Sequence, residues 1–338
     1  MLNINKKIRF EIDKHLDLSN MKYLLLKTKN IYNIENYDKK IDLFINLGLI
    51  NNIRRINKFH ESVNLKLDFG GFYIVCSETL EERRRRVNMK YPYGMKTIFR
   101  IIDFIYKRVF PKLPLFKRIY FSLTQGNNRV ISKAEILGRL FSCGFDIINY
   151  FECNNLLYVI SKKVKKPEYN FFASYSPIFK MKRIGYKGQD INVYKLRTMY
   201  PYSEYLQDFI IKENKLARSG KVLNDYRITT WGKLCRKFWL DELPMFINFF
   251  KGQLGLVGVR PLSRGYFKKY PKYLQELRIK VKPGLIPPYY ADLPNNFNDI
   301  LKSEEVYIKQ KLLYPIVTDL KYFSYAFLNI VFRGARSK

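Results

Sequence analysis

Residues 240–262, LDELPMFINFFKGQLGLVGVRPL, combine a helix start, a helix stop and a glycine-flanked extended segment. Proline is comfortable only in the first turn of an α-helix, so Pro244 predicts a helix that begins here, with Asp241 and Glu242 at its amino end. The helix is expected over residues 243–250, ending near Gly252, with an apolar face made of Leu243, Phe246, Ile247 and Phe250. Residues 255–259 then predict a short strand or loop.

The carboxylate pair at this helix start has two interpretations. Free N–H groups and the helix macrodipole favour negative charge there, which keeps a carboxylate ionised. An ionised Asp241 could then be a nucleophile towards phosphorus, and Glu242 could hold a divalent cation. The alternative is helix capping, which is the routine role of acidic residues at helix starts.

Cations and glycines accompany the acidic pair along the chain. They are Arg227, Arg236, Lys237 and Arg260, with Lys195 and Arg197 upstream on a segment expected to be extended. Gly255 and Gly258 precede Arg260-Pro261 and permit close approach of the backbone to a ligand. Carboxylates and several cations without histidine suit phosphoryl transfer, where positioning and charge neutralisation do most of the catalysis. For any single cation, a surface or structural role remains the alternative.

Composition narrows the classes of function. The chain of 338 residues is long enough for two domains, and its 62 Lys and Arg against 29 Asp and Glu give a net charge of +33. Such an excess predicts polyanionic partners: nucleic acid, an anionic membrane surface or phosphorylated substrates. The two histidines and four scattered cysteines argue against a zinc site and a Ser-His-Asp mechanism, and free thiols fit a reducing cytoplasm.

Membrane contact is expected without a spanning helix. The first 15 residues lack the apolar run of a secretory signal, and no stretch approaches about 20 apolar residues. The two most apolar stretches, 145–160 and 312–332, are interrupted by polar or charged residues. A chain of this kind would lie on a membrane or dip into it.

The basic, proline-containing run at 163–167 divides the chain into predicted domains 1–165 and 166–338. The first is expected to be mixed α/β, with a strand at 71–76. The charged run at 81–86 is expected to be a solvated helix face, with a dedicated binding patch as the alternative. An amphipathic helix at 93–110 would pack in the core or lie at a membrane interface. A helix at 132–143 and a hairpin of 145–152 with 156–162 follow. The second domain is expected to be α+β and mainly helical with short strands, including helices at 203–213 and 316–332.

A series of motifs spans about 170–332. In order they are SPIF (176–179), KRIG (182–185) with Gly188, YKLRTM (194–199), DYRIT (225–229) with Gly232, Arg236-Lys237, LDELP (240–244), Asn248, Lys251-Gly252, LVGVRPL (256–262), Arg278, VKPG (281–284) and Asp319-Leu320-Lys321. Their content and order resemble the bacterial sugar transferase family. These are monotopic polyprenyl-phosphate phosphoglycosyl transferases that initiate capsule, O-antigen and exopolysaccharide synthesis.

The resemblance implies a two-step reaction. Asp241 would attack the sugar-bearing phosphate of a UDP-sugar and expel UMP, and polyprenyl phosphate would then take the sugar phosphate. Glu242 would hold Mg²⁺, and Arg260 would lie on a phosphate-binding loop with Gly258 and Pro261. The other positions that match active-site motifs are Lys195, Arg197, Asp225, Arg227 and Arg236. The implied location is the cytoplasmic face of the bacterial inner membrane, bound peripherally or monotopically; the sugar, the lipid and any homo-oligomer stay open.

Two departures from the family pattern stand out. Family members carry an apolar re-entrant helix before the Ser-Pro segment, whereas this chain has the hairpin-like residues 145–167 there. The anchor is therefore missing, displaced to 93–110 followed by Pro111 and Pro114, or replaced by interfacial helices. The segment 285–296, LIPPYYADLPNN, also differs from the family's Gly-rich segment, which leaves the sugar donor open.

Two rival functions stay open. A basic nucleic-acid-binding module fits the charge, but no RRM, KH, zinc-finger or helix-turn-helix signature is present, so nucleic acid is not the expected partner. A non-catalytic scaffold would keep the fold but would not need Asp241 and Glu242.

Overall fold

The computed structural model describes residues 4–169, 176–213 and 225–333, which form two compact units. The first unit contains residues 4–169 together with 199–213 and 225–228 of the described chain. The second contains residues 176–198 and 229–333. No sequence signal indicated that residues 199–213 and 225–228, which lie beyond the boundary predicted near 165, belong to the first unit.

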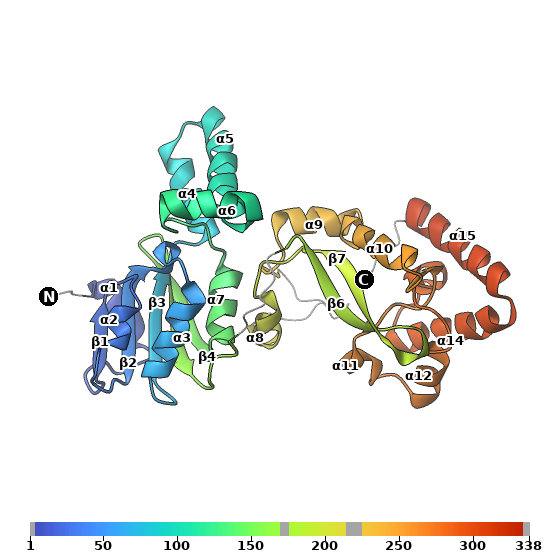
Figure 1. The fold of residues 1–338 in the computed structure, drawn as a ribbon, viewed down its shortest axis with the longest axis horizontal. Coiled ribbons are helices and arrows are strands. Elements are labelled where there is room, and N and C mark those ends of the chain that lie inside the picture. The colour runs from blue at the N-terminus through green and yellow to red at the C-terminus, as the bar shows by residue number, and fades with distance from the viewer. Residues whose placement is uncertain (1–3, 170–175, 214–224, 334–338) are drawn as a thin grey trace. The chain divides into compact units, whose positions relative to one another are not determined.

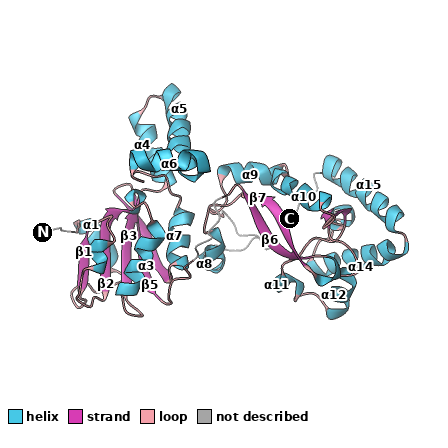
Figure 2. Ribbon diagram, viewed as in Figure 1, coloured by secondary structure: helices cyan, strands magenta, loops and turns pink. Residues whose placement is uncertain are grey.

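The first unit is built on a five-stranded mixed sheet of order β1-β2-β3-β5-β4 (Figures 1 and 2). Parallel pairing joins β1 (Tyr23–Leu26), β2 (Leu43–Leu49) and β3 (Phe72–Ser77). The predicted hairpin is confirmed as antiparallel β4 (Phe145–Cys153) and β5 (Leu156–Lys163). Asn154 and Asn155 both have positive φ, 51° and 57°, as a tight two-residue hairpin turn requires.

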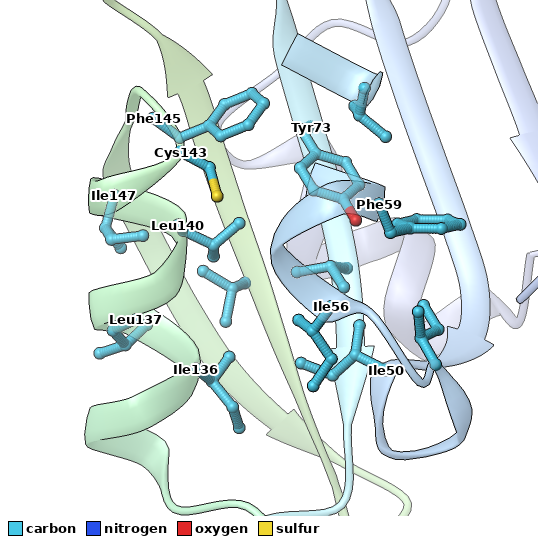
Figure 3. Packing of buried hydrophobic residues seen from close by; sticks show 14 of the residues in the cluster. Ile50, Ile56, Phe59, Tyr73, Ile136, Leu137, Leu140, Cys143, Phe145 and Ile147 are labelled. Carbon is cyan, nitrogen blue, oxygen red and sulfur yellow. The ribbon is translucent and has the colours of Figure 1, made fainter. Parts of the chain in front are cut away.

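Helices cover both faces of this sheet because its strands alternate apolar side chains between two cores. On one face, side chains of α3 (Ile56–Lys66), α7 (Lys133–Ser142) and β3 form a single cluster that includes Phe59, Leu140 and Tyr73 (Figure 3). On the other, α1 (Lys6–Asp13) packs Ile12 against Leu43 and Ile160. The short α2 (Tyr32–Glu35) and η1 (Ile50–Asn52) complete the connections.

The helix predicted over 132–143 is confirmed as α7. Ser132 caps it by accepting a hydrogen bond from the Glu135 amide at 3.2 Å. Gly144 ends it with a φ of 87°, which glycine adopts without strain. The helix predicted over 203–213 is also confirmed, as a 3-10 turn, η5 (Ser203–Leu206), followed by α8 (Gln207–Glu213).

A helical segment between β3 and α7 differs from the prediction. α4 (Leu80–Lys90) carries the charged run 81–86, yet Arg83 is buried and donates from Nε to Asp103 Oδ2 at 2.6 Å, so a wholly solvated face was wrong. Asp103 belongs to α5 (Tyr93–Phe104). The helix predicted to 110 ends as α-helix at Phe104, and continues as the π-helix η2 (Ile105–Val109) and the 3-10 helix η3 (Phe110–Lys112) before α6 (Pro114–Thr124).

The second unit combines short strands with many helices, as expected. An antiparallel hairpin of β6 (Ile178–Ile184) and β7 (Asp190–Leu196), joined through η4 (Tyr186–Gly188), is followed by α9 (Thr230–Lys237), η6 (Leu240–Met245) and α10 (Phe246–Phe250). β8 (Gly255–Val257) pairs in parallel with β9 (Gly284–Ile286). The remaining helices are α11 (Arg264–Phe267), α12 (Lys272–Arg278), α13 (Tyr289–Asp292), α14 (Phe297–Leu313) and α15 (Pro315–Arg333), the last confirming the helix predicted over 316–332. Among the described helices, none has the length and apolarity to cross a membrane.

Candidate active site

One face of the β6–β7 hairpin lines a cavity of about 350 Å³. Met181 lies opposite Val193 in the antiparallel register, and Arg183 lies opposite Ile191. Since side chains alternate along a strand, Met181, Arg183, Val193 and Lys195 all point to this face. The cavity is completed by Glu242, Met245, Arg260, Pro261, Leu262, Ser263, Tyr266, Tyr270, Gly284, Leu285, Pro287, Tyr289, Ile300 and Glu304. Lys195, Glu242, Arg260 and Pro261 were all predicted site residues.

The carboxylate pair lies in the first turn of η6, as predicted, although the helix does not begin at Pro244. A 3-10 helix starts at Leu240, directly after Trp239 in the left-handed region (φ 55°), and Pro244 lies inside it. The α-helical part begins only at Phe246. The tighter 3-10 turn brings the two acids to the amino end of the whole helical segment.

The Glu242 side chain accepts a hydrogen bond from Lys195. Its Oε1 lies 2.5 Å from Lys195 Nζ, and the two side chains are only 31% and 16% exposed. This ion pair joins the inward face of β7 to η6. It places a positive charge beside the acidic pair and at the wall of the cavity.

Asp241 has a pKa above its ordinary value. Burial is the largest cause; Lys195 opposes it, neighbouring Glu242 raises the pKa further, and Arg236 lowers it. The direction is opposite to that expected from the helix end alone, because removing a carboxylate from water outweighs the helix dipole. The two cations, Lys195 and Arg236, therefore favour the ionised form of this half-buried carboxylate.

The side chain of Arg236, on α9, is oriented by a hydrogen bond to Thr198, just after β7. Its Nε donates to Thr198 Oγ1 at 2.9 Å. The helix start is fixed by Thr229, whose hydroxyl accepts from the Gly232 amide at 2.7 Å. A Cβ on Gly232 would lie 2.0 Å from the Thr198 carbonyl oxygen, so only glycine lets the helix approach the strand this closely.

The backbone of Arg260 is fixed by a hydrogen bond from the buried Arg278. Arg278 Nη2 donates to the Arg260 carbonyl oxygen at 2.6 Å, and its Nη1 pairs with Glu304. Tyr289 lies beside the Arg260 side chain at the cavity wall. Tyr289 and, to a lesser degree, Glu242 raise the pKa of Arg260 against the effect of burial. The loop thus presents a fixed cation to the cavity.

Gly258 has a structural explanation. A Cβ on Gly258 would lie 2.7 Å from the Gly284 nitrogen and the Lys282 oxygen, and one on Gly284 would lie 2.1 Å from the Gly258 nitrogen. The close backbone approach expected here is therefore made by β8 and β9 to each other. A contact between Gly258 and a ligand stays a prediction.

Six predicted residues are not among those that line the cavity: Asp241, Arg236 and Gly258, described above, and Arg197, Asp225 and Arg227. Arg197 donates from Nε to the Ser176 oxygen at 3.1 Å, with its guanidinium 5.3 Å from the centre of the Phe179 ring. Asp225 and Arg227 belong to the first unit, where Arg227 Nη2 lies 2.7 Å from Asp225 Oδ2 and both side chains are under 10% exposed, at 5% and 8%. Arg227 Nη1 also donates to Gln207 at 2.7 Å. Their roles at the active site stay predictions.

Arg183 was overlooked as a site residue. It donates to the Lys182 oxygen at 2.9 Å and to the Met181 sulfur at 3.1 Å, and among the described residues no carboxylate pairs with it. Burial, and then the charge of Arg260, lower its pKa. A half-buried cation that faces a second cation across a cavity is an anion-binding arrangement. The alternation of β6 was the signal that could have found it.

The donor set of the cavity fits Mg²⁺. No three His, Cys, Asp or Glu side chains gather in the described part of the chain, so no cage made of protein ligands is present there. Mg²⁺ usually needs only one or two carboxylates and completes its shell with water and substrate phosphates. Glu242 supplies one such carboxylate at the cavity wall, beside the cations that would attract the phosphates.

Residues 167–333 match the sequence model of the family described as "Bacterial sugar transferase". This half of the chain belongs to the bacterial sugar transferase family. The sugar transferase half is 33% identical over 165 residues to "Galactosyl transferase CpsE" of Streptococcus agalactiae, an alignment that covers 48% of this chain and 36% of that protein. It is 35% identical over 167 residues to the "UDP-glucose:undecaprenyl-phosphate glucose-1-phosphate transferase" of Klebsiella pneumoniae, covering 48% and 33%.

A third relative is the "Undecaprenyl-phosphate galactose phosphotransferase" of Salmonella typhimurium, 33% identical over 113 residues, or 32% of this chain and 24% of that protein. The chain therefore spans about a quarter to a third of the length of these three relatives. Among solved structures, the chain is similar to "PigF with SAH" over 44% of this chain and 52% of that chain, at 10% identity and a TM-score of 0.28.

Proposed function

We propose that the chain transfers a sugar 1-phosphate from a UDP-sugar to a polyprenyl phosphate, through a covalent intermediate on Asp241. The observation that carries the proposal is the pairing of Lys195 with Glu242 at a cavity that also presents Arg183 and Arg260. Acids next to several fixed cations suit a displacement at phosphorus. The names of the Klebsiella and Salmonella relatives support the donor and acceptor classes.

In the first step, a carboxylate oxygen of Asp241 attacks the phosphorus that bears the sugar. The bond from this phosphorus to the UMP oxygen breaks, UMP leaves with the electron pair, and an aspartyl phosphosugar ester remains. Arg183, Arg260 and Lys195 are positioned to neutralise the diphosphate during this displacement. When bound, Mg²⁺ held by Glu242 would neutralise further charge on the phosphate oxygens.

In the second step, a phosphate oxygen of the polyprenyl phosphate attacks the same phosphorus. The Asp241 carboxylate leaves, and the product is a polyprenyl diphosphosugar. Both nucleophiles are anions, so neither needs a histidine to remove a proton. This agrees with a chain whose two histidines, His15 and His60, both lie in the first unit.

The lipid acceptor has an apolar surface to approach beside the carboxylate pair. The apolar face predicted for residues 243–250 is not packed in a core. Phe250 is 82% exposed, and the other three residues of this face, Leu243, Phe246 and Ile247, are exposed too. Helix α9, which contacts η6, continues this surface. Its exposed apolar residues are Trp231, Leu234, Phe238, Leu243, Phe246, Ile247 and Phe250. A surface of this kind beside the site supports action at a membrane, proposed here to be the cytoplasmic face of the bacterial inner membrane.

Release of UMP tests the proposal. Wild-type protein incubated with a panel of UDP-sugars and polyprenyl phosphate in detergent should release UMP, and Asp241→Asn should release none. Without acceptor, intact-mass spectrometry should show a sugar-phosphate adduct on the wild type only. The matched control is Asp299→Asn, since Asp299 also lies in the first turn of a helix, α14, and should leave turnover unchanged. An active Asp241→Asn protein, or an adduct mapped to another residue, would refute the mechanism.

A further inference from the structure

A helical projection leaves the layered part of the first unit. It is defined here as residues 93–124 and consists of α5, the π-helix η2, the 3-10 helix η3 and α6. In the view of Figure 1, α5 stands outside the sheet and the helices that cover it. The projection therefore adds little to the core of the unit, and its outer surface needs another explanation.

Both helices of the projection expose apolar side chains along one face. No residue of α5 is buried, and Met95, Ile98, Ile102 and Ile105, spaced by three or four residues, are 42% to 59% exposed. On α6 the corresponding set, Leu115, Phe116, Ile119 and Leu123, is 40% to 78% exposed. Single exposed apolar residues are ordinary, but two continuous helical faces are the mark of an interaction surface.

The base of the projection is well anchored, so this exposure is not a consequence of loose packing. Arg83 of α4 donates two hydrogen bonds to Asp103, of 2.6 and 2.7 Å. Arg108 lies 2.5 Å from the buried Glu135 of α7. Tyr120 of α6 is buried and packs edge-on against Tyr106, with ring centres 5.6 Å apart. The projection is a fixed element with a bare outer surface.

The positive charge of the projection indicates which partner covers its apolar surface. The projection contains seven Lys and Arg against a single acid, and this acid, Asp103, is already paired with Arg83. Lys96 and Arg100 lie on α5 next to its apolar face, and the exposed Lys117 and Arg118 lie on α6. An apolar face bordered by these four cations complements a layer of acyl chains under anionic headgroups. A second copy of the chain, with the same excess within a net charge of +33, would bring like charges together.

We infer that the helical projection lies in the interfacial layer of an anionic phospholipid membrane, with the apolar faces of α5 and α6 among the acyl chains and the cations at the phosphates. The inference rests on the proposed function in one respect, because a polyprenyl phosphate acceptor resides in a membrane. The projection adds a membrane contact in the first unit, separate from the apolar surface around α9 and α10.

Binding to vesicles tests the inference on the full chain. The test variant combines Ile98→Asn, Leu115→Asn, Ile119→Asn and Leu123→Asn, which change only exposed side chains. The control variant combines Leu65→Asn and Phe69→Asn, which are equally exposed elsewhere in the first unit at 64% each. With phosphatidylglycerol-containing vesicles, the test variant should bind on the order of tenfold or more weakly than wild type, and the control should bind normally. Hydrogen exchange of residues 93–124 should slow on addition of these vesicles to the wild type.

The outcomes separate this inference from the proposed function. In detergent, the test variant should still release UMP, whereas Asp241→Asn should bind vesicles like wild type and release none. Normal vesicle binding by the test variant, or unchanged hydrogen exchange over 93–124, would overturn the inference whatever the assay shows. A lipid-free wild-type dimer that the test variant converts to monomer would also overturn it, and would assign the surface to contact between copies. Vesicle binding lost only on Phe246→Asn and Phe250→Asn would leave the membrane contact to the second unit alone.

Discussion

Lys195 Nζ lies 2.5 Å from Glu242 Oε1, although 47 residues separate the two in the chain. The contact ties the cavity face of β7 to the first turn of η6, and the same ammonium group lowers the pKa of Asp241 against the effect of burial. One cation thus serves both carboxylates: it fixes the position of one and favours the ionised form of the other.

Removing this charge should move the acidic limb of the pH–rate profile. Asp241 must be ionised to attack, so activity rises as pH increases through its pKa, which burial has already raised. Lys195→Gln removes a cause that lowers this pKa, so the limb of kcat/KM for UMP release should shift to higher pH. Lys195→Arg, which keeps the charge, should shift it much less. A limb that stays in place or moves to lower pH in Lys195→Gln would show that Lys195 does not act on Asp241.

Arg183→Gln should weaken use of the donor. The substitution removes one cation facing Arg260 in the cavity and leaves the packing of β6 largely unchanged. A hydrogen bond to a charged group contributes about 1.5–3 kcal/mol, so kcat/KM should fall roughly tenfold to a hundredfold. Arg264→Gln is the control, because Arg264 is exposed and pairs with Asp190 at the surface. Unchanged kcat/KM in Arg183→Gln would exclude Arg183 from phosphate binding.

Metal binding should depend on Glu242. EDTA should abolish transfer, and added Mg²⁺ or Mn²⁺ should restore it, because a hard cation bound by few protein oxygens is easily removed. Mn²⁺ binding followed by electron paramagnetic resonance with UMP present gives a readout that needs no turnover. Glu242→Gln should reduce this binding, whereas Glu305→Gln should not, because Glu305 of α14 pairs with Lys309 and does not line the cavity. Full activity after exhaustive dialysis against EDTA would contradict the proposal.

His60 should make the stability of the first unit depend on pH. It is fully buried, with Nδ1 3.1 Å from the Tyr73 hydroxyl, and burial lowers its pKa from 6.5 to about 3. As the pH falls from 6.5 to 5, His60 therefore becomes protonated in the unfolded chain but stays neutral in the native state. The free energy of unfolding should fall with falling pH by up to about 1.4 kcal/mol per unit from this group.

His60→Asn removes that titration. Chemical denaturation from pH 7 to 5, followed by a signal from the first unit, should show a smaller pH slope for His60→Asn than for wild type. His15→Asn, a change at the other histidine of the chain, is the matched control. An equal slope in wild type and His60→Asn would show that His60 is not held neutral in the native state.

The sequence predicted those turns and helix ends that depend only on residues adjacent in the chain. Asn154-Asn155 specified the β4–β5 turn, since asparagine tolerates the positive φ that a tight hairpin needs. Ser132 and Gly144 bounded α7. The strand β1 was missed because it has only four residues. The strand β2 was missed because its first four residues are all buried, so it reads without a clear alternation of apolar and polar residues.

By itself the sequence determined which residues carry charge beside Asp241 and Glu242, and that these acids begin a helical segment. The tertiary structure decided which of the cations meet them. It brought Arg183 into the cavity through pairing of β6 with β7, and it placed Arg227 in a buried pair with Asp225 in the first unit. The physical reason is that a turn or cap depends on neighbours in the chain, whereas the face a strand presents depends on its register with a partner strand.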